Sequence, residues 1–187
     1  RLSLVGSEMC IRDRFNIILS QQIGFGFYES AKINPYDYIH CYLNIPDTSN
    51  RDSLFQAEAR RCKNIIDNID YDKNKRHFCI FDELYSGTNP YEAVASAVSY
   101  LDYICNNNNV TFILTTHYVE LCKKLYKIQK TRVVNKHMKV NKDNFGDFKF
   151  TYKLINKISN IKGGIKVLKD LNYPTKIINT TKEIIYC

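Results

Sequence analysis

HFCIFDELYSGTNPYEA, residues 77–93, is the segment from which the fold class of this 187-residue chain can be predicted. Its apolar start, His77–Phe81, has the length of a buried strand and is followed by an acidic pair. Asn89 and Pro90 then have the residue types of a helix N-cap and a first helical position. After that helix, Val110–Thr115 forms a second apolar run of strand length, which is followed by Thr116 and His117. Strand, helix and strand in this order predict an α/β fold, a parallel sheet with crossover helices.

Three polar side chains follow these two strands. Asp82 and Glu83 come at the end of the first strand, and His117 comes at the end of the second. Ligands bind at the carboxyl edge of an open parallel sheet. One carboxylate there can hold Mg²⁺, the next can orient or deprotonate an attacking water, and the histidine can reach the same phosphate. The alternative is a solvated strand end with a structural histidine.

Two longer segments, FDELYSGTNPYEAVASAV (81–98) and LTTHYVEL (114–121), resemble the ATPase domain of the MutS family of DNA mismatch-repair proteins. The 34 residues from Glu83 to His117 fit one crossover helix and the returning strand. The resemblance implies a P-loop NTPase of the ABC type, with ATP and Mg²⁺ as cofactors. It also implies that Asp82 helps to hold Mg²⁺, that Glu83 is the general base or water positioner, and that His117 is the switch histidine near the γ-phosphate.

The resemblance extends to both sides of this centre. Residues 21–39 resemble the segment after the family's phosphate-binding loop, and residues 44–58 resemble its signature segment, with the pattern S-x-F-x-x-E. Residues 163–178 resemble the terminal helix–turn–helix that helps to clamp the family's two subunits together. We therefore interpret residues 15–157 as a partial MutS-like ABC ATPase domain and residues 158–187 as a helix–turn–helix dimerisation element.

The resemblance also implies two groups of residues that face the nucleotide of the opposite subunit. They are Asn50, Arg51 and Ser53 in the signature segment, and Gly87, Thr88 and Asn89 in the loop after the acidic pair. The alternative is that Ser53 and Asn89 cap the helices that they precede, and the two roles are compatible. Tyr85 and Ser86 stand where the family usually has Gly and Arg, so this loop is expected to differ in detail.

The N-terminal part of the sequence departs most from the family. No G-x-x-x-x-G-K-[ST] motif is present, although the resemblance places this phosphate-binding loop just before residue 15. Residues 1–14, RLSLVGSEMCIRDR, lack helical and strand periodicity and resemble a translated sequencing adaptor, so we interpret them as an artefact. We expect the natural protein to extend further toward its N-terminus and to be an ATPase. The chain alone is expected to be inactive, and mismatched double-stranded DNA is expected to bind through upstream domains.

Composition bounds the remaining possibilities. No run approaches the roughly 18 apolar residues of a spanning helix, which excludes a membrane protein. The seven cysteines are scattered without a C-x-x-C pair, as expected of reduced thiols in an intracellular protein of the nucleus, an organelle or the cytoplasm. The net charge of +8 fits a nucleic-acid or phosphate partner. Another ABC-type ATPase and a non-hydrolysing dimerisation module, acting as a homo- or heterodimer, remain as alternatives.

Local patterns predict further elements. Ser53 and Gln56 fit a capping box that opens a helix, and Phe15–Ile23 fits the tail of a buried helix. The helix after Ser53 is expected to run to about Asp67 with this inner face: Leu54, Ala57, Arg61 and Ile65. The other expected elements are short strands in 32–43, a helix in 119–126, an antiparallel hairpin from 128–140 and 148–154, and two C-terminal helices that begin near Gly163 and Pro174.

Overall fold

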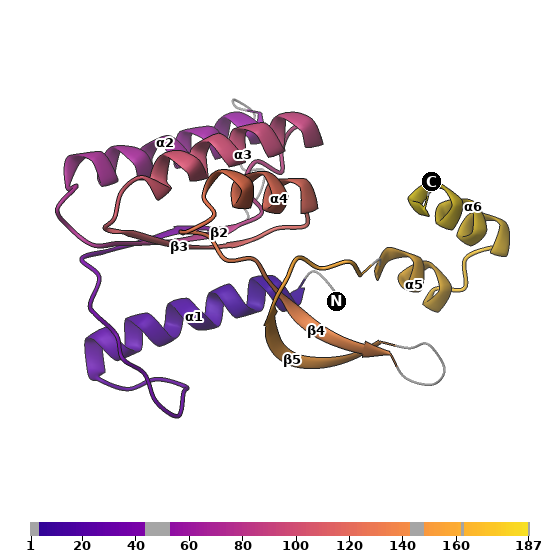
Figure 1. The fold of residues 1–187 in the computed structure, drawn as a ribbon, viewed down its shortest axis with the longest axis horizontal. Helices are drawn as coiled ribbons and strands as arrows, with labels where there is room; N and C mark the ends of the chain where they lie inside the picture. Colours follow the sequence, from indigo (N-terminus) through magenta and orange to yellow (C-terminus); the bar gives the residue numbers. More distant parts are fainter. Residues whose placement is uncertain (1–3, 44–52, 143–147, 162, 187) are drawn as a thin grey trace. The chain divides into compact units, whose positions relative to one another are not determined.

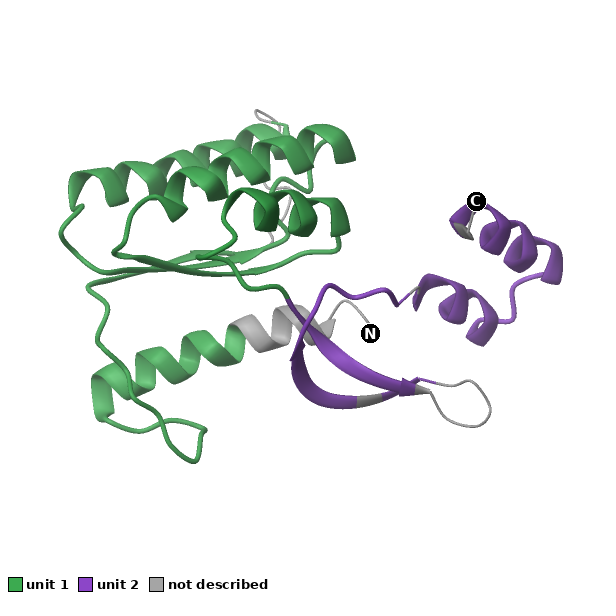
Figure 2. Cartoon of the chain, viewed as in Figure 1, with its two compact units in different colours: residues 1, 3–135 green, residues 2, 136–187 purple. Residues whose placement is uncertain are grey.

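The computed structural model describes residues 4–43, 53–142, 148–161 and 163–186 (Figure 1). The chain forms two compact units, the first ending at Asn135 and the second beginning at Lys136 (Figure 2). Among the described residues, none of the helices combines the length and the apolar character needed to cross a bilayer.

A three-stranded parallel sheet is the centre of the first unit. The strands lie in the order β1 (Tyr38–Tyr42), β2 (His77–Asp82) and β3 (Val110–Thr115). Helix α2 (Leu54–Tyr71) connects β1 to β2, and α3 (Pro90–Cys105) connects β2 to β3. The predicted α/β class, with a parallel sheet and crossover helices, is therefore confirmed.

Helices cover both faces of this sheet. Helices α2, α3 and α4 (Val119–Ile128) lie on one face, and α1 (Leu4–Ile23) lies on the other (Figure 1). The residues of β2 accordingly alternate between two cores. Phe78 and Ile80 pack on the side of α1, whereas Cys79 and Phe81 belong to the core beneath α2 and α3. Burial on both faces explains the continuous apolar run that the sequence shows here.

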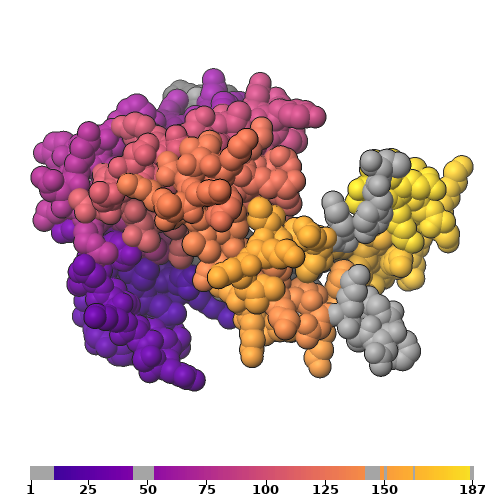
Figure 3. All heavy atoms as spheres, in the orientation of Figure 1, coloured from indigo at the N-terminus to yellow at the C-terminus, as the bar shows by residue number. Residues whose placement is uncertain are grey.

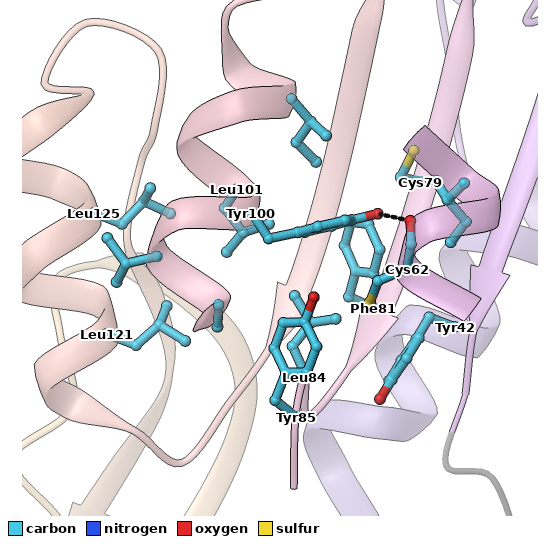
Figure 4. Packing of buried hydrophobic residues seen from close by; sticks show 14 of the residues in the cluster. Tyr42, Cys62, Cys79, Phe81, Leu84, Tyr85, Tyr100, Leu101, Leu121 and Leu125 are labelled. Carbon is cyan, nitrogen blue, oxygen red and sulfur yellow. Dashed lines mark hydrogen bonds between the residues drawn. The ribbon is translucent and has the colours of Figure 1, made fainter. Parts of the chain in front are cut away.

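Aromatic rings fill the core beneath α2 and α3 (Figure 4). Phe81 packs edge-on against Tyr100, with ring centroids 5.6 Å apart and planes at 89°. The Tyr100 hydroxyl donates a hydrogen bond to the carbonyl of Cys62 at 3.3 Å, so this polar atom is satisfied inside the core. Tyr42, at the end of β1, lies against the same Phe81 ring at 6.3 Å. This core fixes the carboxyl ends of β1 and β2, where the predicted site lies.

Helix α1 differs from the sequence prediction. It is continuous from Leu4, whereas the sequence analysis sets residues 1–14 outside the fold. The predicted helix tail, Phe15–Ile23, is present as its C-terminal part. Arg14 reaches the sheet, where its guanidinium donates to the Sγ of Cys41 at 3.6 Å. The helix ends at Ile23, and the next residue, Gly24, has a φ of 78° that suits glycine. Packing on the sheet stabilises a helix that has no regular apolar stripe. The adaptor origin of residues 1–14 stays a prediction.

Helix α2 begins at the predicted capping box, but of its predicted inner face only Ile65 is buried. The Ser53 hydroxyl accepts from the Gln56 N–H at 3.3 Å, and the Gln56 side chain accepts from the Ser53 N–H at 2.9 Å. The buried residues are Glu58, Cys62, Ile65 and Ile69. Arg61 is exposed and donates to the carbonyl of Cys41. The true face is displaced because it contains a buried glutamate, which a search for apolar periodicity passes over.

The second unit contains a hairpin and two helices. Strands β4 (Lys136–Lys142) and β5 (Phe148–Asn156) pair antiparallel, as predicted. The first strand begins later than expected, because α4 ends at Ile128 and residues 129–132 form a turn. The predicted C-terminal helix, turn and helix are also present as α5 (Gly163–Asp170) and α6 (Thr175–Tyr186).

Candidate functional site

The predicted catalytic side chains meet at the carboxyl edge of the sheet. Asp82 ends β2 opposite Thr115, the last residue of β3. The backbone N–H of Glu83 donates to the carbonyl of Thr115 at 3.0 Å, which extends the strand pairing by one residue. His117 follows two residues after β3, and its Nε2 lies 2.9 Å from the Glu83 Oε1. Residues 34 positions apart in the sequence thus form one contact.

Glu83 and His117 are accessible to solvent. Their side chains are 41% and 62% exposed. Asp82 is half-buried, and one of its carboxylate oxygens accepts a hydrogen bond from the Thr115 hydroxyl. This edge therefore offers an oriented carboxylate, a second carboxylate paired with an imidazole, and access for a small molecule or water.

The chemistry of Asp82 and Thr115 suits a hard cation. Carboxylate and hydroxyl oxygens are the ligands that Mg²⁺ prefers, and Mg²⁺ bound in this way usually completes its shell with water and phosphate. Within the described parts of the chain, no three His, Cys, Asp or Glu side chains converge on a point that could hold a metal ion by themselves. Asp82 and Thr115 would therefore supply only part of the coordination shell of such a cation.

The loop after the acidic pair has an unusual backbone. Glu83 and Tyr85 have φ values of 52° and 59°, in the left-handed region that side chains other than glycine rarely adopt. Tyr85 is the position at which the resemblance predicts glycine. Its ring is buried between Phe55, at 5.6 Å, and Tyr100, at 6.3 Å. Burial raises the pKa of Tyr85, so its hydroxyl stays protonated. The buried ring holds the loop in a conformation that its backbone alone would not favour.

A residue to which sequence analysis gave no role holds the same loop. Glu58 is 3% exposed, and its Oε1 accepts from the N–H and the hydroxyl of Ser86 at 3.1 and 2.8 Å. Its Oε2 accepts from the N–H of Gly87 at 3.0 Å. Burial and then the charge of Glu58 raise the pKa of Tyr42, whose hydroxyl is also buried. The sequence signal for this role of Glu58 is its place as the glutamate of the pattern S-x-F-x-x-E. Glu58 lies on the same buried helix face as Cys62.

Residue 87 must be a glycine because the loop packs closely against α2. A Cβ at this position would lie 2.7 Å from the Cγ of Leu54 and 2.8 Å from the backbone N of Phe55. The loop therefore packs directly on the first turn of α2, and its Gly87 N–H is bonded to Glu58. In this conformation the Gly87 N–H is already bonded to Glu58, so it is not free for the predicted contact with a nucleotide.

The other residues predicted to contact the nucleotide are either helix caps or neighbours of a cap, or they lie outside the part of the chain that the structure describes. Ser53 caps α2, and the Asn89 side chain accepts from the N–H groups of Tyr91 and Glu92 at 3.1 and 3.0 Å, so it caps α3. The Thr88 hydroxyl donates to the Glu92 carboxylate at 2.7 Å. The predicted capping roles are confirmed, and the predicted nucleotide contacts stay predictions. Asn50 and Arg51 lie outside the residues that the structure describes.

The fold and the site define an α/β protein with two carboxylates and a histidine gathered at the carboxyl edge of a parallel sheet. The sequence profile of MutS domain V matches residues 4–186, almost the whole chain. The chain therefore belongs to the MutS family. The match includes residues 4–14, which form the first part of α1.

Individual relatives agree with this family. The chain is 28% identical over 157 residues to the endonuclease MutS2 of Staphylococcus epidermidis, covering 84% of the chain and 19% of that protein. It is 28% identical over 185 residues to the DNA mismatch repair protein MutS of Orientia tsutsugamushi, covering 98% of the chain and 20% of that protein. It is 29% identical to the corresponding protein of Clostridium perfringens, with the same two coverages. The chain thus spans about a fifth of the length of these relatives.

Proposed function

We propose that this chain is the C-terminal ABC-type ATPase part of a MutS-like DNA mismatch-repair protein. In this proposal, ATP hydrolysis at a dimer interface controls a clamp that holds mismatched DNA. The observation that carries it is the contact between Glu83 and His117 beside Asp82, at the carboxyl ends of two neighbouring parallel strands. Phosphoryl transfer needs an aligned water and compensated charge, and these three side chains supply the groups for both.

Glu83 and His117 would act on the attacking water and the γ-phosphate. The carboxylate of Glu83 would accept a hydrogen bond from the water and orient it or take its proton. The imidazole of His117 lies 2.9 Å from the same carboxylate, so it would help to fix the direction of Glu83. His117 is 62% exposed, which leaves it able to donate to a phosphate oxygen once a nucleotide is bound.

Asp82 and Thr115 would hold the magnesium ion of the nucleotide. When bound, Mg²⁺ neutralises charge on the phosphate oxygens. The hydrogen bond from the Thr115 hydroxyl fixes the rotation of the Asp82 carboxylate. The chain contains no G-x-x-x-x-G-K-[ST] and spans about a fifth of its relatives, so in this proposal the loop that cradles the phosphates lies in another part of the protein.

The second unit has exposed apolar residues that could contact a partner subunit. In α5 and α6 the buried apolar residues are Ile165 and Ile178, at 8% and 9% exposure, whereas Val167 and Ile184 are 42% and 74% exposed. Apolar side chains left exposed on a helix pair favour a protein contact. The proposed dimer would also bring Ser53 and Thr88 toward the nucleotide of the other subunit. The names of the relatives support DNA mismatch repair or a MutS2-like endonuclease as the setting.

The test is Glu83→Gln in the full-length protein that contains this chain. We expect ATP hydrolysis to fall at least about 100-fold while ATP is still bound, because the substitution removes the proton acceptor and keeps the shape. Glu120→Gln is the matched control, since Glu120 is 61% exposed on α4 and pairs with Lys123. Hydrolysis that survives Glu83→Gln would contradict the assignment of Glu83. A wild-type protein that dimerises but neither binds nor hydrolyses ATP would support the dimerisation module instead.

A further inference from the structure

The buried carboxylate of Glu58 connects helix α2 to the loop at residues 84–89. Both of its oxygens accept hydrogen bonds from this loop, one from Ser86 and one from Gly87. Glu58 is 3% exposed, so these bonds are shielded from water, and loss of a partner would leave a buried polar group unsatisfied. A carboxylate placed in this way fixes the position of the loop relative to α2.

The loop needs such an anchor because its start is strained. Glu83 and Tyr85, with φ values of 52° and 59°, adopt a conformation that persists only when the surrounding structure holds it. On one side, the N–H of Glu83 is bonded to the carbonyl of Thr115. On the other side, Ser86 and Gly87 are bonded to Glu58. The strained turn is thus held between β3 and α2.

We propose that Glu58 is a positioning residue for ATP hydrolysis: it holds the loop against α2 and so keeps the Glu83 carboxylate beside His117. This inference rests on the proposed function, since it concerns the reaction assigned to Glu83. The loop presents three donors, and both oxygens of a carboxylate can accept them. A glutamine would place an amide NH₂ against a loop donor, so the loop would have to move. A displacement of about 1 Å at a catalytic group can cost roughly 100-fold in rate.

The first test compares Glu58→Gln with wild type in full-length protein. We expect kcat for ATP hydrolysis to fall at least about 10-fold with little change in KM, because the variant disturbs the reacting group and leaves the phosphate-binding groups intact. Asp67→Asn is the matched control. Asp67 is on the same helix, is 56% exposed and pairs with Lys63, and its substitution should leave kcat unchanged.

The second test measures hydrogen exchange in the chain itself. In Glu58→Gln the amides of Ser86 and Gly87 should exchange at least about 10 times faster, while those of Cys79 and Ile80 in β2 keep their wild-type rates. Ser86→Ala removes one of the three hydrogen bonds without burying a new polar group, so it provides a milder variant if Glu58→Gln does not fold. Its effect on kcat should be non-additive with that of Glu58→Gln, since both act through one loop.

The outcomes separate this inference from the function on which it rests. A lower kcat, faster exchange in the loop and non-additivity support it. If wild type hydrolyses ATP and Glu58→Gln retains full kcat, the positioning role is wrong and the proposed function stands. Additive effects, or unchanged exchange at Ser86 and Gly87, also overturn it. If wild type does not hydrolyse ATP, the proposed function fails and this inference fails with it.

Discussion

Replacing Gly87 by alanine tests the close packing of the loop on α2. The new Cβ would lie 2.7 Å from the Cγ and 2.8 Å from the Cβ of Leu54, and 2.8 Å from the backbone N of Phe55. Favourable contacts between carbon atoms lie at about 3.5–4.0 Å. The Leu54 side chain could rotate, but the backbone of Phe55 is part of the first turn of α2. The clash is therefore relieved only if the loop and the helix separate.

The expected cost follows from the two ways in which the chain can respond. Overpacking without separation costs about 1–3 kcal/mol. Separation removes the hydrogen bond from the Gly87 N–H to Glu58 and leaves a buried acceptor, at a cost of about 1–3 kcal/mol. These costs are alternatives, and the lower entropy of an unfolded chain with alanine opposes them by about 0.4–1 kcal/mol. We expect Gly87→Ala to lower the free energy of unfolding by about 1–2 kcal/mol.

The assay is urea unfolding followed by circular dichroism, together with hydrogen exchange at residues 84–89. Gly164→Ala is the control, because Gly164 lies in α5 and a Cβ there would meet no atom within 4 Å. That substitution should stabilise its helix by roughly 0.5–1 kcal/mol. Equal stability of Gly87→Ala and wild type, with unchanged exchange in the loop, would refute the packing described here.

Four further outcomes are expected. Tyr85→Gly relieves a backbone cost of about 1–2 kcal/mol but deletes a buried ring worth about 3–5 kcal/mol, so urea unfolding should show a net loss; a gain would contradict this balance. Asn89→Ala should cost α3 about 1 kcal/mol in thermal unfolding, and Asn89→Asp should retain most of the cap. Burial, and then the charge of His77, lowers the pKa of His40 in the folded chain. The contribution of His40 to stability is therefore complete above the unfolded pKa of about 6.5 and is lost as the pH falls below that value. A urea midpoint that stays constant between pH 7 and 5 would argue against this. Burial raises the pKa of Cys79 to about 12, so iodoacetamide at pH 8 should label this thiol only after unfolding. Labelling of Cys79 in the native chain would show that this part of the core is open to the reagent.

The pattern of apolar runs and helix caps was sufficient to predict most helices and strands of the first unit. Strand β2, the Asn89 cap and strand β3 lie where the sequence predicts them, because each signal is local. The predictions failed where a helix depends on its partners. Helix α1 has no regular apolar stripe and forms on the sheet, and the inner face of α2 contains Glu58 in a position where apolar periodicity expects a hydrophobic residue.

The chemical groups at the carboxyl edge of the sheet follow from the order of the residues alone. A buried strand that ends in Asp82 and Glu83, and a neighbouring strand followed by His117, must bring these side chains together once the strands pair in parallel. This inference needs only the lengths of the two apolar strands and the right-handed crossover through the helix between them.

How that edge is held depends on contacts between residues that are far apart in the sequence. Glu58 bonds to backbone groups 28 and 29 residues further along the chain, and Gly87 lies against Leu54. Backbone N–H groups carry no signature in the sequence, so the partner of a buried carboxylate cannot be read from residue types. The strained φ values of Glu83 and Tyr85 are stable for the same reason. They depend on contacts with β3 and α2, which exist only after the sheet and its helices have packed.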